Sequence, residues 1–215
     1  MRPPSPPRFN ADIANQENTE PNMPAMMMCT QLAGRAIIRV VTRCNDAQEN
    51  NNLDLSECQL MQVPDAVYHL MRHTELKGCN LSGNVITKIP PKFAVKFSLI
   101  TDLNLSNNTM SKLPDELADL AALERLDISH NAFIALPHAV YKMPKLSKLN
   151  ASHNHIVEIE VDRLEQTESL EDVDLQENPL TMPNRNALQL VTRPRVVLSV
   201  TAADASEEDW DDLNV

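Results

Sequence analysis

Six aspartate and asparagine side chains recur along the chain at regular intervals and are the residues best suited to chemistry: Asp54, Asn80, Asn104, Asp127, Asn150 and Asp174. Successive members lie 26, 24, 23, 23 and 24 residues apart. Their carboxylates and amides could bind a basic or backbone-rich ligand. Such oxygens also bind Ca²⁺, but half of the set is asparagine and regular spacing does not converge six oxygens on one ion. We expect a polar binding strip and no metal; the alternative is that these side chains are only solvated.

Histidine and cysteine form no recognisable catalytic or metal-binding set. His130 and His153 lie one repeat interval apart, so their rings should stack, and His155 lies nearby. No fixed third ligand accompanies them, so zinc is not expected. The sequence contains no nucleophile–base–acid set and no phosphate-binding loop. We therefore predict that the chain is not an enzyme and needs no cofactor.

The C-terminal segment, residues 201–215, contains Trp210, the only tryptophan, and Leu213 among six acidic residues. An aromatic residue followed three positions later by an aliphatic one, with acidic flanks, resembles the short motif that adds a strand to autophagy ubiquitin-like modifiers. Two alternatives stay open. Trp210 could pack on the C-terminal end of the domain, or the final three residues could enter a PDZ groove.

The polar strip belongs to a longer repeat, which must position it. The segment from Leu103 to Leu120 reads L-x-L-x-x-N-x-Φ-x-x-L-P-x-x-L-x-x-L, where Φ is apolar. Each copy of this repeat carries one Asn or Cys at the position of the N in the pattern. We call these the keystone residues: Cys58, Asn84, Asn108, Asn131, Asn154 and Asn178. Several apolar positions match in each copy, so the periodicity is a strong signal.

The residue types of the repeat predict its local structure. The L-x-L pair is a short strand whose alternate side chains point into a core. The keystone amide can hydrogen-bond the backbone of the buried turn that follows. Proline then begins a convex segment of short helix or 3₁₀ turn with one apolar face inward. Stacked copies bury these faces together, so the fold class is an α/β solenoid: an arc of about six repeats with a parallel concave sheet.

The units Leu105-Ser106-Asn107-Asn108 and Leu113-Pro114 resemble the 23-residue class of intracellular leucine-rich repeats. The likeness covers about residues 35–200 and implies a small arc that binds proteins. It implies no catalytic residues.

The sequence divides into five segments. Residues 1–28 are rich in Pro, Asn, Glu and Met and should be disordered. Residues 29–49 predict an N-terminal capping helix. Its outer face carries Arg35, Arg39 and Arg43, and its inner face carries Leu32, Ala36, Ile37, Val40, Val41 and Cys44. The alternative is a helix that binds a partner. Repeats fill residues 50–190, a C-terminal cap with a strand-like piece fills residues 191–200, and residues 201–215 form an acidic disordered tail.

Charge limits the class of partner. The formal net charge is −11 and no segment is basic, so we expect neither nucleic acid nor an anionic membrane as a partner. The N-terminal residues lack the apolar core of a signal peptide, so we expect a cytoplasmic, or else nuclear, protein. We also expect a monomer.

We predict a scaffold or adaptor whose concave face, about 24 Å across six strands, binds one segment of a partner protein. The alternative is a regulatory subunit that modulates an enzyme such as a phosphatase or GTPase.

Overall fold

The computed structural model describes the backbone of residues 25–199 and the side chains of residues 36–199. The chain divides into two units, residues 1–35 and residues 36–215, and the repeats lie in the second unit. None of the described helices has the length and apolar character needed to cross a membrane.

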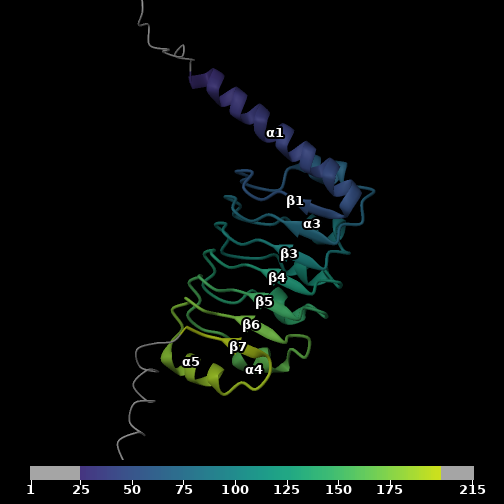
Figure 1. The fold of residues 1–215 in the computed structure, drawn as a ribbon. Coiled ribbons are helices and arrows are strands. Elements are labelled where there is room, and N and C mark those ends of the chain that lie inside the picture. The colour runs from purple at the N-terminus through teal and green to yellow at the C-terminus, as the bar shows by residue number, and fades with distance from the viewer. Residues whose placement is uncertain (1–24, 200–215) are drawn as a thin grey trace, which may run out of the picture. The chain divides into compact units, whose positions relative to one another are not determined.

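Within the described residues, seven three-residue strands form one parallel sheet in chain order (Figure 1). They are β1 (Asn52–Asp54), β2 (Gly78–Asn80), β3 (Asp102–Asn104), β4 (Arg125–Asp127), β5 (Lys148–Asn150), β6 (Asp172–Asp174) and β7 (Arg195–Val197). The middle residue of every strand points inward, and these middle residues pair directly across the sheet, as Leu103 does with Leu126. The predicted solenoid arc is confirmed, and the strand-like piece predicted near residue 196 is the seventh strand.

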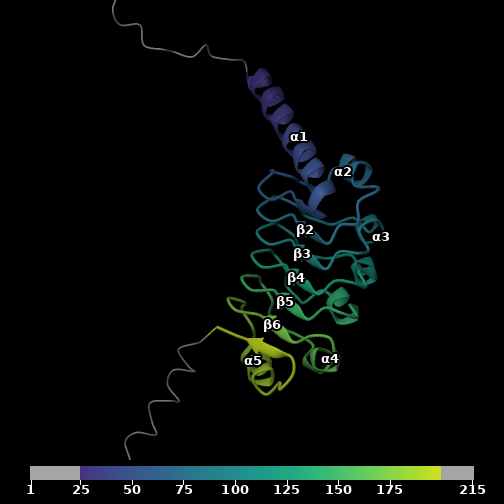
Figure 2. The same ribbon diagram turned by 45° about the vertical axis from the view of Figure 1, so that its right-hand side comes forward.

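Short helical segments return the chain along the opposite side of each repeat (Figure 2). They are α2 (Asp65–Leu70), α3 (Lys92–Lys96), η1 (Asp115–Asp119), η2 (His138–Lys142), α4 (Val161–Gln166) and α5 (Met182–Gln189). Proline precedes the first four of these segments, where its fixed φ and missing N–H suit a helix start. Each of the six buries at least one side chain against the strands.

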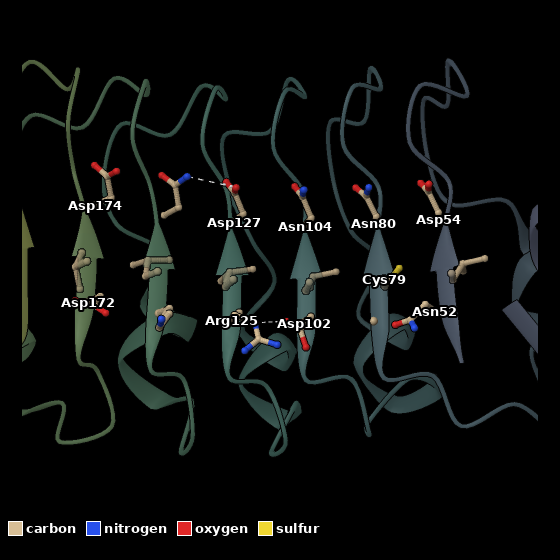
Figure 3. Close-up of a pocket in the computed structure, with 18 of the residues that line it drawn as sticks. Asn52, Asp54, Cys79, Asn80, Asp102, Asn104, Arg125, Asp127, Asp172 and Asp174 are labelled. Atoms are coloured by element: carbon tan, nitrogen blue, oxygen red, sulfur yellow. Dashed lines mark hydrogen bonds and ion pairs between the residues drawn. The ribbon is translucent and has the colours of Figure 1, made fainter. Parts of the chain in front are cut away.

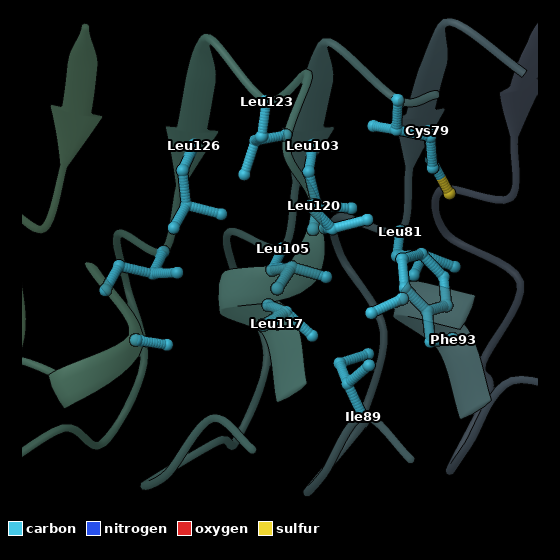
Figure 4. Close-up of a cluster of buried hydrophobic side chains, with 14 of the residues drawn as sticks. Cys79, Leu81, Ile89, Phe93, Leu103, Leu105, Leu117, Leu120, Leu123 and Leu126 are labelled. Carbon is cyan, nitrogen blue, oxygen red and sulfur yellow. The ribbon is translucent and has the colours of Figure 1, made fainter. Parts of the chain in front are cut away.

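The core is a continuous apolar layer between the strands and the convex segments. Leu103 and Leu126 extend from neighbouring strands toward Leu105 and Leu117, and Phe93 fills the space one repeat earlier (Figure 4). A fully buried leucine of this kind contributes roughly 1.5–3 kcal/mol. Because each repeat supplies several such side chains to its neighbours, the strands are held in register by packing on both sides.

The keystone asparagines join consecutive repeats, as predicted. Asn108 Nδ2 donates to the carbonyl oxygens of Leu81 (3.0 Å) in the preceding repeat and Leu105 (3.0 Å) in its own. Asn108 Oδ1 accepts the N–H of Ile86 at 3.0 Å. The amide thus satisfies buried backbone groups of two repeats at once, which explains its recurrence.

The capping helix α1 (Ala25–Asn50) begins four residues before the predicted position and presents a different face to the repeats. Val40 and Cys44 are buried as expected, but Ile37 and Val41 are exposed by 65% and 37%. The prediction that these two face inward is wrong. Two of the arginines, Arg39 and Arg43, contact the first repeat instead. Arg39 Nη1 donates to the carbonyl oxygen of Glu57 (3.1 Å) in the loop that follows β1. Arg43 Nη1 donates likewise to that of Ser56 (2.6 Å). These carbonyls lie at the open edge of the first repeat and need donors, a requirement that apolar periodicity does not reveal.

Candidate functional site

The six predicted binding residues all lie on the concave face, at the carboxyl ends of β1 to β6 (Figure 3). We call them the Asx row: Asp54, Asn80, Asn104, Asp127, Asn150 and Asp174. Strand pairing places each beside the next, for example Asp127 beside Asn150. The row lines a groove of about 630 Å³ that runs across all seven strands, a length of about 29 Å at the usual strand spacing.

One oxygen of every Asx side chain has a local structural role. Asp127 Oδ1 accepts the N–H of Ser129 at 2.9 Å, and Asn104 Oδ1 accepts that of Ser106 at 2.9 Å. The other four members make the same bond two residues onward, at 2.9 to 3.1 Å. This is an Asx turn, which bends the chain away from the strand. The turn explains why only Asp and Asn occur at these positions. This structural role was not predicted from the sequence, although a Ser that follows two residues later in most repeats could have indicated it.

The second polar atom of most members remains available to a ligand. Asn150 Nδ2 donates to Asp127 Oδ2 at 3.3 Å. Among the described residues, no hydrogen bond engages Asn80 Nδ2, Asn104 Nδ2 or Asp174 Oδ2. The row therefore offers amide donors in its first half and carboxylate acceptors toward its second half.

A second row of side chains borders the groove at the amino ends of the same strands. This lower row was not predicted as a set; it comprises Asn52, Gly78, Asp102, Arg125, Lys148, Asp172 and Arg195. Arg125 Nε pairs with Asp102, and this contact raises the pKa of the guanidinium. No ion pair engages Lys148, Asp172 or Arg195 within residues 36–199. The sequence indicates the position of the row, since each member precedes an inward strand residue, but the residue types vary from member to member and do not mark it as a set.

Electrostatics differ between the two rows. The Asx row carries three carboxylates and no cation, whereas the lower row carries the three cations of the groove. At the first strand, burial opposes ionisation of Asp54, but hydrogen bonds from Ser56 and the nearby Arg43 guanidinium lower its pKa. Asp54 therefore stays ionised, but Arg43, at 3.5 Å, partly neutralises it. Unpaired charge lies toward β5 to β7.

The predicted histidine stack is confirmed outside the groove, with ring centroids of His130 and His153 4.1 Å apart. Within the part of the chain whose side chains are described, no group of three or more His, Cys, Asp or Glu could hold a metal ion. Trp210 and Leu213, singled out in the sequence, lie outside the described residues.

Comparisons with known proteins fit this geometry. Residues 74–133 match the family model described as leucine rich repeat. The fold is a leucine-rich-repeat solenoid. The chain is 31% identical over 95 residues to leucine-rich repeat-containing protein 20 of Homo sapiens, covering 42% of this chain and 52% of the relative. It is 30% identical over 91 residues to the Mus musculus protein of that name, covering 40% and 50%. The matched region spans about half the length of these relatives.

Among solved structures, a leucine-rich-repeat protein of Leptospira interrogans aligns with a TM-score of 0.56 and 27% identity. The alignment covers 66% of this chain and 35% of that one. These likenesses support a leucine-rich-repeat interaction module. The leucine-rich-repeat sheet of this chain thus carries one groove, lined by two polar rows of different charge.

Proposed function

We propose that this protein is a non-enzymatic scaffold or adaptor that binds one segment of a partner protein in its concave groove. The observation that carries this proposal is the groove itself, which polar side chains line on every strand. Several of their polar atoms and charges, such as Asn104 Nδ2, Lys148 and Asp174 Oδ2, have no internal partner among the described residues. The family likeness supports a protein-binding role in general.

The dimensions of the groove favour a single segment over a broad surface. A length of about 29 Å corresponds to roughly 19 helical residues at 1.5 Å each, or about nine extended ones. The charge of the two rows adds a requirement. A bound segment should place basic side chains over Asp127 and Asp174 and acidic ones near Lys148 and Arg195.

The experiment begins with proximity labelling of the full chain to identify partners, followed by affinity measurements with purified components. The test variant is Asp127→Asn combined with Asp174→Asn. Asparagine keeps the oxygen that forms the Asx turn and removes the charge, so the fold should be preserved. We expect the affinity to fall on the order of tenfold, the equivalent of about 1.4 kcal/mol.

The matched control is Asp162→Asn combined with Glu165→Gln on α4, where both side chains are exposed on the convex side. It removes the same net charge from the protein. If the two double variants lose affinity equally, long-range charge and not the groove governs binding, and the assignment of the site is wrong.

A further inference from the structure

The loops that follow the strands form a second face, along one edge of the solenoid. In each repeat the residue before the keystone has a left-handed backbone; these residues are Glu57, Gly83, Asn107, His130, His153 and Glu177, with φ between 52° and 66°. Each of the first five donates its N–H to a carbonyl of the following repeat, as His130 does to Ser152 at 3.0 Å. The row is therefore an ordered ladder, one rung per repeat.

Two neighbouring repeats give this edge an apolar and aromatic surface, which we call the imidazole patch: His130, Ala132, Ile134, His153, His155 and Val157. The rings of His130 and His153 stack with an interplanar angle of 23°. Ile134 is 67% exposed and Val157 43% exposed. None of these six residues carries a carboxylate, and the N–H groups of imidazoles donate hydrogen bonds to carboxylates.

The described part of the chain ends on the same edge as this patch, two repeats beyond it. At the last rung, the N–H of Glu177 has no following repeat and instead donates to Ser199 Oγ at 2.6 Å. The Ser199 hydroxyl donates in turn to Glu177 Oε1 at 3.1 Å. Ser199 thus takes the place of a seventh rung, two rungs from His153 and three from His130. At the usual strand spacing, three rungs are about 14 Å.

The segment that follows has the length and chemistry to cover the patch. Residues 200–215 carry six acidic residues around Trp210 and Leu213. Eleven residues from position 200 to Trp210 span up to about 36 Å, more than twice the distance required. The concave groove is a poor alternative for this acidic segment, because five carboxylates line it against three cations, and one of those cations, Arg125, is already paired with Asp102.

We propose that the acidic C-terminal segment folds back on its own solenoid, placing Trp210 and Leu213 on Ile134 and Val157 and its carboxylates beside the imidazoles. The contact shields both apolar side chains of the segment from other proteins until it is released. It is independent of the proposed function of the concave groove.

The sole tryptophan provides the assay, since all tryptophan fluorescence of the chain comes from Trp210. In the full chain we expect emission at shorter wavelength, and weaker quenching by acrylamide, than in a peptide of residues 200–215. Ile134→Ser combined with Val157→Ser should return both readings to those of the peptide, and His130→Gln with His153→Gln should move them part of the way. Circular dichroism would confirm that each variant is folded.

The matched control is Met61→Ser combined with Val85→Ser, which removes two exposed apolar side chains from the same edge in the first two repeats. It should leave the fluorescence unchanged. The proposal is overturned if wild type already matches the peptide, if the Ile134 and Val157 variant keeps the wild-type reading, or if the control moves equally. A reading that changes with protein concentration would overturn the intramolecular contact in favour of a second copy.

Discussion

Replacing Asn131 with alanine should destabilise the solenoid by about 3 kcal/mol, because this side chain joins two repeats. Its Nδ2 donates to the carbonyl oxygens of Leu105 (3.0 Å), Ile128 (3.1 Å) and Ser129 (3.0 Å). Its Oδ1 accepts the N–H of Met110 at 3.0 Å. The residue is 7% exposed, so water cannot readily replace these bonds.

The magnitude follows from which groups lose their only partner. Each of the three carbonyls keeps another donor. The Leu105 carbonyl keeps Asn108 Nδ2, the Ile128 carbonyl keeps Asn154 Nδ2, and the Ser129 carbonyl keeps the N–H of Asn107. Only the N–H of Met110 is left without a partner, at about 1–3 kcal/mol. The shared bonds from Nδ2 add about 1 kcal/mol or slightly more, since they compete for two hydrogens.

The assay is urea unfolding followed by circular dichroism, with Cys58→Ala as the control. Cys58 occupies the keystone position of the first repeat and is buried, but its thiol joins no hydrogen-bond network among the described residues. Its replacement should remove about 1 kcal/mol of packing. In thermal unfolding, 3 kcal/mol corresponds to roughly 6–12 °C in a chain of this size. Equal losses at Asn131 and Cys58 would refute the claim that the keystone amide is the connecting element.

Two further predictions concern alkaline pH and backbone conformation. Burial raises the pKa of Cys79 to about 12 and that of Cys44 to about 11, from 9.0, so the folded state retains protons that the unfolded state releases. The contribution of these two thiols to stability should therefore be constant below pH 9 and be lost between pH 9 and 12. When urea midpoints are compared across pH, the loss over this range should be smaller in Cys79→Ala. Gly83→Ala should cost about 1 kcal/mol of unfolding free energy at φ +66°, whereas Gly78→Ala, which meets only the flexible Asn52 side chain, should cost little.

The repeat and its core were predictable because an apolar residue recurs at the inward position of every strand. The keystone bonds and the stack of His130 on His153 followed from the same periodicity. The orientation of α1 did not, because it depends on carbonyl groups of the first repeat, which Arg39 and Arg43 satisfy. Hydrophobic spacing carries no information about such backbone acceptors.

The concave site was predictable only in part. The Asx row was found from its spacing, but its turn-forming role depends on a bond to the backbone two residues onward. The lower row was missed as a set because its residue types vary from Asp102 to Arg125 and Lys148, so no single type marks it. Its position is fixed by strand pairing, which places variable side chains in one line.

Site-specific photo-cross-linking would show whether the partner binds in the concave groove. A photoreactive residue would replace Lys148 in the groove or, in a second protein, Glu116 on the convex segment η1, both of which are exposed to solvent. We expect a cross-link from position 148 to one continuous segment of the partner and little from position 116. Efficient cross-linking from position 116 with none from position 148 would contradict the assignment of the groove.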